Sequence, residues 1–517
     1  MKPDAVHMEK ILVLDFGSQY TQLIARRVRE NGVYCEILPC TAARADIKKF
    51  GPKGIILSGS PFSVHQKGAP KIPAGVLEMG LPVLGICYGL QAITRAMGGR
   101  VAKSDKREYG PATLVVDETV GIFAGLSMNE EVWMSHGDRI EAMPKKFHRI
   151  AHTVNSPVAA MKHDTLPIFA LQFHPEVAHT PMGTRMLVNF VKGICGCSGT
   201  WNMRSFLDSA VEDIRAKVGA DRVILGISGG VDSTVAAALV HRAIGDQLTC
   251  LFIDNGLMRK DEARKVLQGF RANLHIKVQF ADASKLFLSA LKNVTDPEKK
   301  RKVVGHKFID VFRKEARKIG KVKYLAQGTL YPDVIESVSF RGPSVVIKSH
   351  HNVGGLPKVM KLKLLEPLRE LFKDEVRQLG AELGVDESFI YRQPFPGPGL
   401  SIRIIGAVTP ERLKVLREAD HIIVEEIKNA GLYREIWQSF GVLLPVKSVG
   451  VMGDERTYEN VLAVRAVTSR DGMTADWARL PEKLLASISS RIINEVKGIN
   501  RVVYDISSKP PATIEWE

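Results

Sequence analysis

The chain has 517 residues, which is too long for one hydrophobic core and predicts several domains. Hydrophobic residues make up 45% and charged residues 25%, as in ordinary globular proteins, and no apolar run approaches the roughly 20 residues that span a membrane. Six cysteines in this length exclude a disulfide framework. The polar start lacks the apolar stretch of a signal peptide, so we expect a cytoplasmic protein without a membrane partner.

The net charge is +16, and half of it lies between residues 292 and 323, where 12 Lys/Arg stand against 4 Asp/Glu. Its densest point is Lys299-Lys300-Arg301-Lys302. Three interpretations are open: a solvated helix face, an electrostatic funnel for phosphorylated substrates, or a nucleic-acid surface. The first two are favoured, because no aromatic-interleaved basic stretch of the kind that stacks bases accompanies the cluster. We therefore expect no nucleic-acid partner.

Residues 10–190 alternate short apolar strands with helical segments. Continuous apolar runs at this spacing predict a mostly parallel sheet covered on both faces. Near residues 193–200 the composition shifts to Gly, Cys and Ser, which is typical of a linker. We therefore predict a first domain at residues 9–198. Its expected strands are residues 11–14, 54–57, 83–86 and 168–171.

The segment Gly85-Ile86-Cys87-Tyr88-Gly89 follows one of these strands and opens a helix. It has the form of a nucleophile elbow with Cys in place of Ser, in which glycines permit the strained turn and the helix N-terminus stabilises a thiolate. Further along, Phe173-His174-Pro175-Glu176 follows the last strand. His174 is a candidate general base, and Glu176 is placed to fix its tautomer. A buried core cysteine and a structural histidine are the plain alternatives.

Three more segments accompany these two: Asp15-Phe16-Gly17-Ser18-Gln19, Ser58-Gly59-Ser60-Pro61 and Ser135-His136-Gly137-Asp138. Together the five resemble the class I glutamine amidotransferases, which hydrolyse glutamine through a Cys-His-Glu triad. Ser60 stands where that family more often has a second glycine, so the fit requires that Ser60 needs no positive φ. The resemblance implies a catalytic set of Cys87, His174 and Glu176, an oxyanion hole from the N–H groups of Gly59 and Tyr88, and glutamine contacts from Gln91 and Asp138.

A second α/β region begins near Trp201, with expected strands at residues 223–227, 248–253 and 323–326. The first strand runs into Ser228-Gly229-Gly230-Val231-Asp232-Ser233 and then a helix. A glycine-rich turn at a helix start binds phosphate through free N–H groups and the helix dipole. No Walker A lysine is present, and Asp232 could instead help to hold Mg²⁺ on a polyphosphate. The pattern resembles the ATP pyrophosphatases, which cleave ATP to AMP and pyrophosphate.

Polar residues follow the other strands of this second domain, predicted at residues 199–392. In a doubly wound sheet ligands lie at the carboxyl ends of the strands, which favours a nucleotide role for Asp254. Asp333 and Glu336 follow the third strand and suit ligand hydroxyls or metal, although an N-cap or a surface charge is the alternative for each. Lys348 lies in a basic, glycine-bearing segment typical of a lid, and Lys373 is expected to reach the ATP phosphates.

The remaining residues, 393–517, form the third predicted domain. The tail Lys509-Pro510-Pro511-Ala512-Thr513-Ile514-Glu515-Trp516-Glu517 and residues 393–400, 437–440 and 468–477 resemble the GMP synthases, a resemblance that covers nearly the whole chain in the right order. It implies XMP, ATP and glutamine as substrates, Mg²⁺ as cofactor, and a homodimer formed by this domain. The XMP contacts that we expect are Arg301, Asp333, Glu336, Lys348, Gln438, Arg501, Lys509 and Glu515.

The sequence thus predicts two doubly wound, mostly parallel α/β domains and a smaller α+β C-terminal dimerisation domain. The expected reaction activates XMP with ATP and aminates it with ammonia from glutamine. Two alternatives remain: another amidating ATP pyrophosphatase, such as a glutamine-dependent NAD synthetase, and a tRNA-modifying pyrophosphatase. The first typically has a different glutaminase and would lack this tail. The second would have no use for Cys87, His174 and Glu176.

Overall fold

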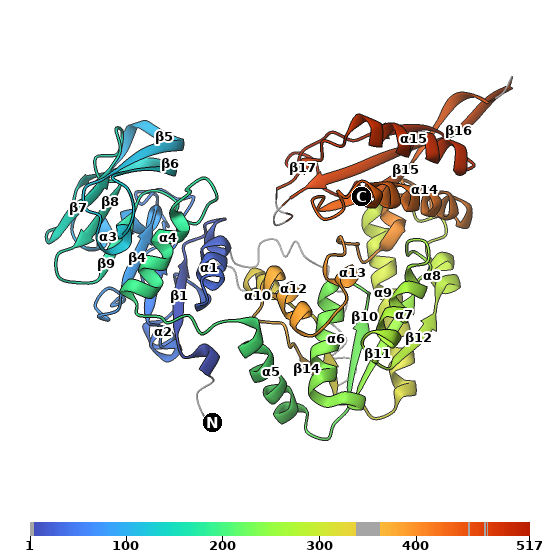
Figure 1. Cartoon of the computed structure of the whole chain (residues 1–517), viewed down its shortest axis with the longest axis horizontal. Coiled ribbons are helices and arrows are strands. Elements are labelled where there is room, and N and C mark those ends of the chain that lie inside the picture. The colour runs from blue at the N-terminus through green and yellow to red at the C-terminus, as the bar shows by residue number, and fades with distance from the viewer. Residues whose placement is uncertain (1–4, 338–361, 453–454, 470–471, 473) are drawn as a thin grey trace. The chain divides into compact units, whose positions relative to one another are not determined.

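The computed structural model describes residues 5–337, 362–452, 455–469, 472 and 474–517 (Figure 1). The chain forms two compact units. The first comprises residues 1–209 and 331–346, and the second comprises residues 210–330 and 347–517. Each unit is built on its own sheet system and is described by itself. In the described parts of the chain, every helix is too short or too polar to cross a bilayer.

A nine-stranded sheet organises the first unit, in the order β2-β1-β3-β4-β9-β8-β7-β5-β6. Five strands are parallel, and the three at residues 54–57, 83–86 and 168–171 are completely buried, as the continuous apolar runs predict. They are β1 (Lys10–Asp15), β2 (Tyr34–Pro39), β3 (Gly54–Leu57), β4 (Val83–Ile86) and β9 (Ile168–Leu171).

The other four strands extend this sheet in antiparallel fashion, which the predicted parallel sheet did not include. In β6 buried and less buried residues alternate, the signature of a sheet with one covered face. These strands are β5 (Arg100–Val116), β6 (Asn129–Ala142), β7 (Phe147–His152) and β8 (Ala160–His163). The helices of the unit are α1 (Thr21–Glu30), α2 (Arg44–Phe50), α3 (Tyr88–Ala96), α4 (Gly183–Val188), η3 (Asn189–Ile194) and α10 (Tyr331–Ser337).

The second unit contains a fully parallel sheet in the order β12-β11-β10-β13-β14. The chain winds outward from β10 in both directions, so the predicted doubly wound fold is confirmed and the switch point lies beside β10. The strands are β10 (Val223–Ile227), β11 (Leu248–Asp254), β12 (Val278–Asp282), β13 (Tyr324–Ala326) and β14 (Lys363–Leu365). The border between the two units in the sequence, after residue 209, falls within α5 (Met203–Val218). The other helices are α6 (Val231–Ile244), α7 (Glu262–Ala272), α8 (Ser284–Ala290), α9 (Pro297–Ile319), α12 (Lys373–Glu382) and α13 (Glu387–Ile390).

A second, mainly antiparallel sheet completes this unit, with helices α14 (Pro410–Asn429) and α15 (Glu482–Glu495) packed against it (Figure 1). Its strands are β15 (Gln438–Met452), β16 (Glu455–Thr468), β17 (Asp476–Trp477) and β18 (Ile499–Tyr504), of which β18 runs parallel to β16. One hydrophobic core joins both sheets, from Ile224 and Leu251 to Leu443 and Leu462. The predicted border at residue 392 is therefore not a break in packing.

Candidate active site

Cys87 occupies the sharp turn between β4 and α3. Its φ of +53° and ψ of −102° are strained for a residue with a side chain, and its N–H donates to Leu171 O at 2.7 Å. The flanking Gly85 and Gly89 have ordinary φ values, contrary to the expectation that they permit the turn. A Cβ on Gly89 would lie 2.5 Å from Leu57 O, so the glycines instead allow α3 to pack closely on the sheet.

His174 and Glu176 stand next to this thiol. His174 Nδ1 donates to Glu176 Oε1 at 2.6 Å, and both side chains are almost fully buried. Burial lowers the pKa of His174, but the Glu176 carboxylate and the Cys87 thiol outweigh it and raise that pKa well above the ordinary value. The Nδ1 contact with Glu176 leaves Nε2 to serve Cys87. Such a buried pair suits proton transfer to and from a nucleophile.

A cavity of about 540 Å³ opens in front of Cys87. Gln91 Nε2 donates to Asp138 O at 3.4 Å, and the Asp138 carboxylate accepts from Ser63 Oγ at 2.5 Å. Lys103 and Arg107 line the same cavity, and the sequence interpretation did not single them out. An acidic group and basic groups in one small cavity match the ammonium and carboxylate ends of an amino acid.

The segment that the sequence predicts as the oxyanion hole lies beside His174. A Cβ on Gly59 would be 3.5 Å from His174 Cε1, which places this backbone against the imidazole. Ser60 lines the cavity and is not among the described residues with positive φ, so the condition for accepting serine at this position is met. Tyr88 begins α3, where its N–H has no partner within the helix.

A buried network that the sequence interpretation missed supports the part of β6 that carries Asp138. His136 Nδ1 donates to Asp138 O at 3.0 Å, and His136 Nε2 lies 3.2 Å from Glu108 Oε2. Thr153 Oγ1 donates to Glu108 Oε1 at 2.8 Å. Burial raises the pKa of Glu108, but these hydrogen bonds lower it below its ordinary value. No local signal marks Glu108, because its partners depend on the antiparallel pairing of β5 with β6 and on Thr153.

In the second unit the loop at residues 228–233 joins β10 to α6. Gly229 takes a φ of +74°, Gly230 is the N-cap of α6, and Ser228 Oγ accepts from Gly230 N at 3.3 Å. Ser233 Oγ donates to Gly230 O at 3.1 Å and closes the turn. The N–H groups at the start of α6 are the unpaired donors that a phosphate needs.

Two residues predicted to serve ATP meet directly at this loop. Lys373 Nζ lies 2.7 and 2.6 Å from the two carboxylate oxygens of Asp232. Asp254, at the end of β11, accepts from Gly256 N at 2.8 Å through one oxygen. No group of three or more metal-ligating side chains occurs among the described residues, and Asp232 is the carboxylate of the loop at residues 228–233. One carboxylate completed by substrate phosphates is a usual Mg²⁺ arrangement, and the residues fit that ion.

Gln438 and Glu515, both predicted XMP contacts, touch each other. Gln438 Nε2 donates to Glu515 Oε1 at 2.7 Å. The same carboxylate accepts from Arg403 Nη2 at 2.8 Å and from Nε at 3.1 Å. Arg403 has no exposed surface and stacks 4.0 Å from the Phe440 ring centroid. Glu515 is thus engaged within the chain, as an anchor of the tail to a buried arginine.

The basic run on α9 serves the tail in the same way. Lys300 is fully buried and donates to Ile404 O at 2.7 Å, to Ser401 O at 3.1 Å and to the Glu517 carboxylate. Arg301, a predicted XMP contact, instead donates to the Glu517 backbone O. Lys299 and Lys302 are exposed. Two residues of the run therefore contact the tail, and the other two form a solvated face. In the sequence, Lys300 can be recognised because it lies on the same buried side of α9 as Val304 and Val311.

The structure separates Arg501 from the other expected phosphate ligand, Lys509. The backbone of Lys509 forms an isolated antiparallel β-bridge with Ala475, next to β17. The Lys509 side chain donates from Nζ to Gly472 O at 2.7 Å. Arg501 is the register partner of Val461, whereas Gln438 faces Val467 on the same strand. Six residues of a strand span about 20 Å. One XMP held at Gln438 is therefore out of reach of Arg501 of the same chain, which donates to Ser448 Oγ at 2.6 Å.

The remaining predicted contacts lie elsewhere. Asp333 and Glu336 belong to α10, which groups with the first unit. Ile37 N donates to Tyr331 Oη at 2.6 Å at the start of this helix. Lys348 lies outside the described residues.

The family comparisons divide the chain in three. Residues 12–194 match the class I glutamine amidotransferase family, residues 202–310 the NAD synthase family, and residues 425–516 the GMP synthase C-terminal domain. A solved GMP synthase subunit from Thermoplasma acidophilum is 36% identical over 37% of this chain and 95% of its own, with a TM-score of 0.33.

Whole-chain relatives are closer. A protein of Brachyspira hyodysenteriae named GMP synthase [glutamine-hydrolyzing] is 60% identical, and the match covers 99% of each chain. One of that name from Maridesulfovibrio salexigens is 56% identical over 99% of this chain and all of the relative. Identity at this level along both whole chains shows common descent of every part, and the chain belongs to the glutamine-hydrolysing GMP synthase family.

Proposed function

We propose that the protein converts XMP, ATP and glutamine to GMP, AMP, pyrophosphate and glutamate. The observation that carries this function is the full-length likeness to proteins of that name together with two separate chemical centres, a buried Cys-His-Glu set and a phosphate-binding loop. The enzyme is a carbon–nitrogen ligase of purine nucleotide synthesis. The three predicted regions, residues 9–198, 199–392 and 393–517, would supply ammonia, activate XMP and complete its binding site.

In the first centre Cys87 would attack the side-chain amide of glutamine and form a thioester. His174 would donate a proton to the departing ammonia and then accept one from the water that hydrolyses the thioester. The raised pKa of His174 supports this role, because a protonated ring is needed when the amine leaves. Gly59 and Tyr88 would donate N–H groups to the developing oxyanion. Gln91 and Asp138 would hold the substrate, with Lys103 and Arg107 near its carboxylate.

In the second centre residues 228–233 would bind the ATP phosphates through N–H groups at the start of α6. XMP oxygen would attack the α-phosphorus and expel pyrophosphate, and ammonia would then displace AMP from the adenylylated base. Bound Mg²⁺ would supply charge neutralisation on the phosphates, with Asp232 as its protein ligand. Lys373 would then pair with phosphate oxygens, and Asp254 lies at a strand end suited to the adenosine.

For XMP we retain a site at the Gln438 end of the second sheet. Gln438 offers an amide to the base, and Lys509 offers a cation to the monophosphate. Glu515, through its contacts with Arg403 and Gln438, would position the tail and the amide. Arg301 would act through Glu517 in the same manner. Asp333, Glu336 and Lys348 stay predictions for the XMP contact set.

We also propose a cytoplasmic homodimer. Six free thiols suit a reducing compartment. The sheet formed by β15, β16, β17 and β18 carries exposed apolar side chains, which support self-association. Val449 faces Tyr458 across β15 and β16, and both side chains are more than half exposed. Sedimentation of the wild type and of Tyr458→Asp tests this: a dimer that dissociates in the variant is expected, and a monomeric wild type would refute it.

The reaction is tested by incubating the protein with ATP, Mg²⁺, XMP and glutamine and measuring GMP and pyrophosphate. Cys87→Ala should lose glutamine-dependent synthesis and keep synthesis from ammonium. Cys40→Ala, which changes another buried free cysteine, is the matched control and should keep both. Loss of both activities in Cys87→Ala would contradict the two-centre assignment.

A further inference from the structure

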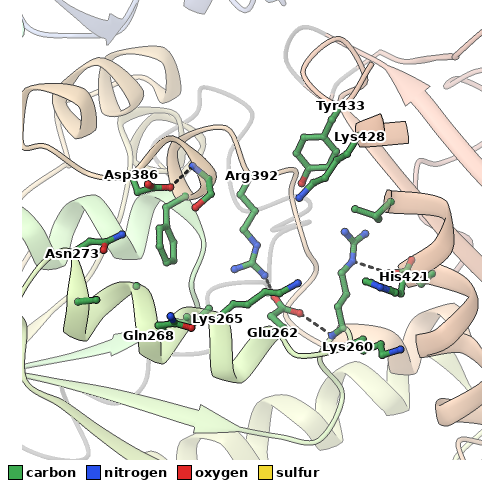
Figure 2. Close-up of a pocket in the computed structure, with 18 residues that line it drawn as sticks. Lys260, Glu262, Lys265, Gln268, Asn273, Asp386, Arg392, His421, Lys428 and Tyr433 are labelled. Carbon is green, nitrogen blue, oxygen red and sulfur yellow. Dashed lines mark hydrogen bonds and ion pairs between the residues drawn. The ribbon is translucent and has the colours of Figure 1, made fainter. Parts of the chain in front are cut away.

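A basic pocket of about 420 Å³ lies in the second unit, between α7, α13 and α14. Five basic side chains line it against three acidic ones, and none of them was assigned a role above (Figure 2). Val266, Phe389 and Val424 give it an apolar wall. A concave site of this size, apolar with a few charges, is typical of small-molecule binding.

The acidic side chains of the pocket are already engaged. Glu262 pairs with Arg392, and Asp420 Oδ2 lies 3.0 Å from Arg259 Nε. Asp386 caps α13 by accepting from Ser388 N at 2.8 Å. Lys260, the remaining basic residue with a partner, pairs with Glu418 at 2.5 Å. Two of the three acids are thus paired with arginines, whereas Asp386 accepts from a backbone N–H and keeps its negative charge.

Lys265 and Lys428 are the cations left over: neither makes an ion pair with any residue that the structure describes. Figure 2 shows both ammonium groups directed toward the space beside Arg392. Lys428 also lies 4.7 Å from the Tyr433 ring centroid. Burial, followed by the charges of Lys265, Arg259 and Arg392, lowers the pKa of Lys428. Two ammonium groups stand here against the one pocket carboxylate without an ion pair among the described residues, that of Asp386, and an excess of positive charge favours binding of an anion.

The inner wall of the pocket is also the support of the ATP loop. Arg392 Nη1 donates to Gly229 O at 2.7 Å. A Cβ on Gly229 would lie 2.4 Å from Val266 Cγ2 and 2.6 Å from Arg392 Nη1. Two lining side chains thus touch the backbone of residue 229, so an anion that draws Arg392 away from Glu262 or from Gly229 would shift the loop.

We propose that this pocket binds a phosphate monoester of the size of a nucleoside monophosphate, and that its occupancy changes the affinity of residues 228–233 for ATP. Lys265 and Lys428 contact the phosphate, and the apolar wall holds the rest of the molecule. The effect on ATP rests on the proposed function of the loop, whereas the binding itself does not.

Residue-resolved lysine acetylation tests the binding in the wild-type protein, with XMP in excess to fill the proposed substrate site. GMP should slow the labelling of Lys265 and Lys428 at least threefold, guanosine should not, and inorganic phosphate should act only at higher concentration. Unchanged labelling with millimolar GMP, or equal protection by guanosine, would overturn the site. This readout needs no activity.

Two variants separate the pocket from general charge effects. Lys265→Glu with Lys428→Glu should weaken the binding of labelled GMP at least tenfold in the presence of excess XMP. Lys414→Glu with Lys483→Glu makes the same charge change at exposed positions outside the pocket and should leave it unchanged. Equal affinity in both double variants would refute the role of the two lysines.

The effect on ATP is measured as the KM for ATP in ammonium-dependent synthesis at saturating XMP, with and without GMP. The wild type should show a several-fold shift that the Lys265→Glu, Lys428→Glu variant lacks. GMP that protects both lysines but leaves the KM for ATP unchanged would overturn the coupling while the binding site stands. Absence of synthesis altogether would instead contradict the proposed function.

Discussion

The ammonium group of Lys373 touches both carboxylate oxygens of Asp232, at 2.7 and 2.6 Å, beside the glycine-rich loop of the second unit. Each of these charges has a natural partner in a metal–polyphosphate ligand: phosphate for the lysine and a divalent cation for the carboxylate. The contact therefore keeps two ligand-binding groups side by side and neutral as a pair. It also brings together an aspartate and a lysine that lie far apart in sequence, as a joint role at the proposed ATP site requires.

Removing the carboxylate should disable the second centre alone. We expect Asp232→Asn to lower ammonium-dependent pyrophosphate release on the order of 100-fold, because the metal loses its protein ligand, while glutamine hydrolysis persists. Asp221→Asn breaks a comparable pair, Asp221 with Lys323 at 2.5 Å, and should leave the rate unchanged. Pyrophosphate release at the wild-type rate in Asp232→Asn would remove Asp232 from the ATP site.

The His174–Glu176 pair gives a pH-dependent prediction. Although burial opposes it, the Glu176 charge raises the pKa of His174, so Glu176→Gln should lower that pKa. The protonated ring is the form that donates to the departing ammonia, and it is lost as pH rises through the pKa. The basic limb of glutamine hydrolysis should therefore move to lower pH.

In Glu176→Gln the rate of glutamine hydrolysis should also fall by roughly 10²–10⁴, as when the orienting carboxylate of a triad is replaced. Glu131→Gln, on the exposed side of β6, is the control and should change neither the rate nor the pH profile. An unmoved basic limb in Glu176→Gln would show that His174 does not set it.

The packing of α3 on the sheet gives a steric prediction. A Cβ on Gly89 would meet the backbone O of Leu57 at 2.5 Å, an atom that cannot rotate away. Gly89→Ala should therefore destabilise the first unit by about 1–3 kcal/mol and displace Cys87. Glutamine-dependent synthesis should fall while ammonium-dependent synthesis continues.

Gly193→Ala is the matched control, since nothing lies within 4 Å of a Cβ at that position and its φ is ordinary. Both variants are compared by thermal unfolding and by synthesis from each nitrogen source. Equal stability of Gly89→Ala and Gly193→Ala would contradict the steric account.

The sequence predicted those parts of the fold that depend on local pattern. Buried parallel strands such as β4 and β10 are continuous apolar runs bounded by glycine, and each of the two chemical loops directly follows one. The antiparallel extension escaped prediction, because β5 and β6 acquire their burial from each other and from β7. Strand pairing between segments that are distant in sequence produces no pattern of hydrophobic residues that could be recognised in either segment alone.

The candidate site divides in the same way. Cys87 and residues 228–233 can be recognised from the adjacent residues in the sequence. Arg403 and Arg392 cannot, because their roles depend on contacts with distant segments: Arg403 with Glu515 in the tail and Arg392 with Gly229 in the loop. Arg501 and Lys509 were grouped as phosphate ligands by the family resemblance. Strand register sets Arg501 about 20 Å along β16 from Gln438 of the same chain, which composition cannot reveal.

Lys300 provides the last prediction, on the stability of the second unit. Its fully buried ammonium group satisfies Ser401 O, Ile404 O and the Glu517 carboxylate, so Lys300→Met would leave a carboxylate without its cation and two carbonyl groups without a donor. Breaking a buried pair in this way costs about 3–5 kcal/mol. We expect the second unit to unfold at lower urea concentration and the tail to become accessible to carboxypeptidase.

Lys302→Met, two residues along α9 and exposed, makes the same chemical change without these partners and should leave both measurements unchanged. Because Arg301 also contacts Glu517, adding Arg301→Met to Lys300→Met should remove the remaining contact of Glu517 with α9 and make the end of the tail still more accessible. If Lys300→Met were as stable as Lys302→Met and kept the tail protected, the buried lysine would not hold the tail. The tail would then be held by the Arg403–Glu515 pair, by Arg301, and by the hydrogen bonds that Arg465 donates to Thr513 O and Ile514 O.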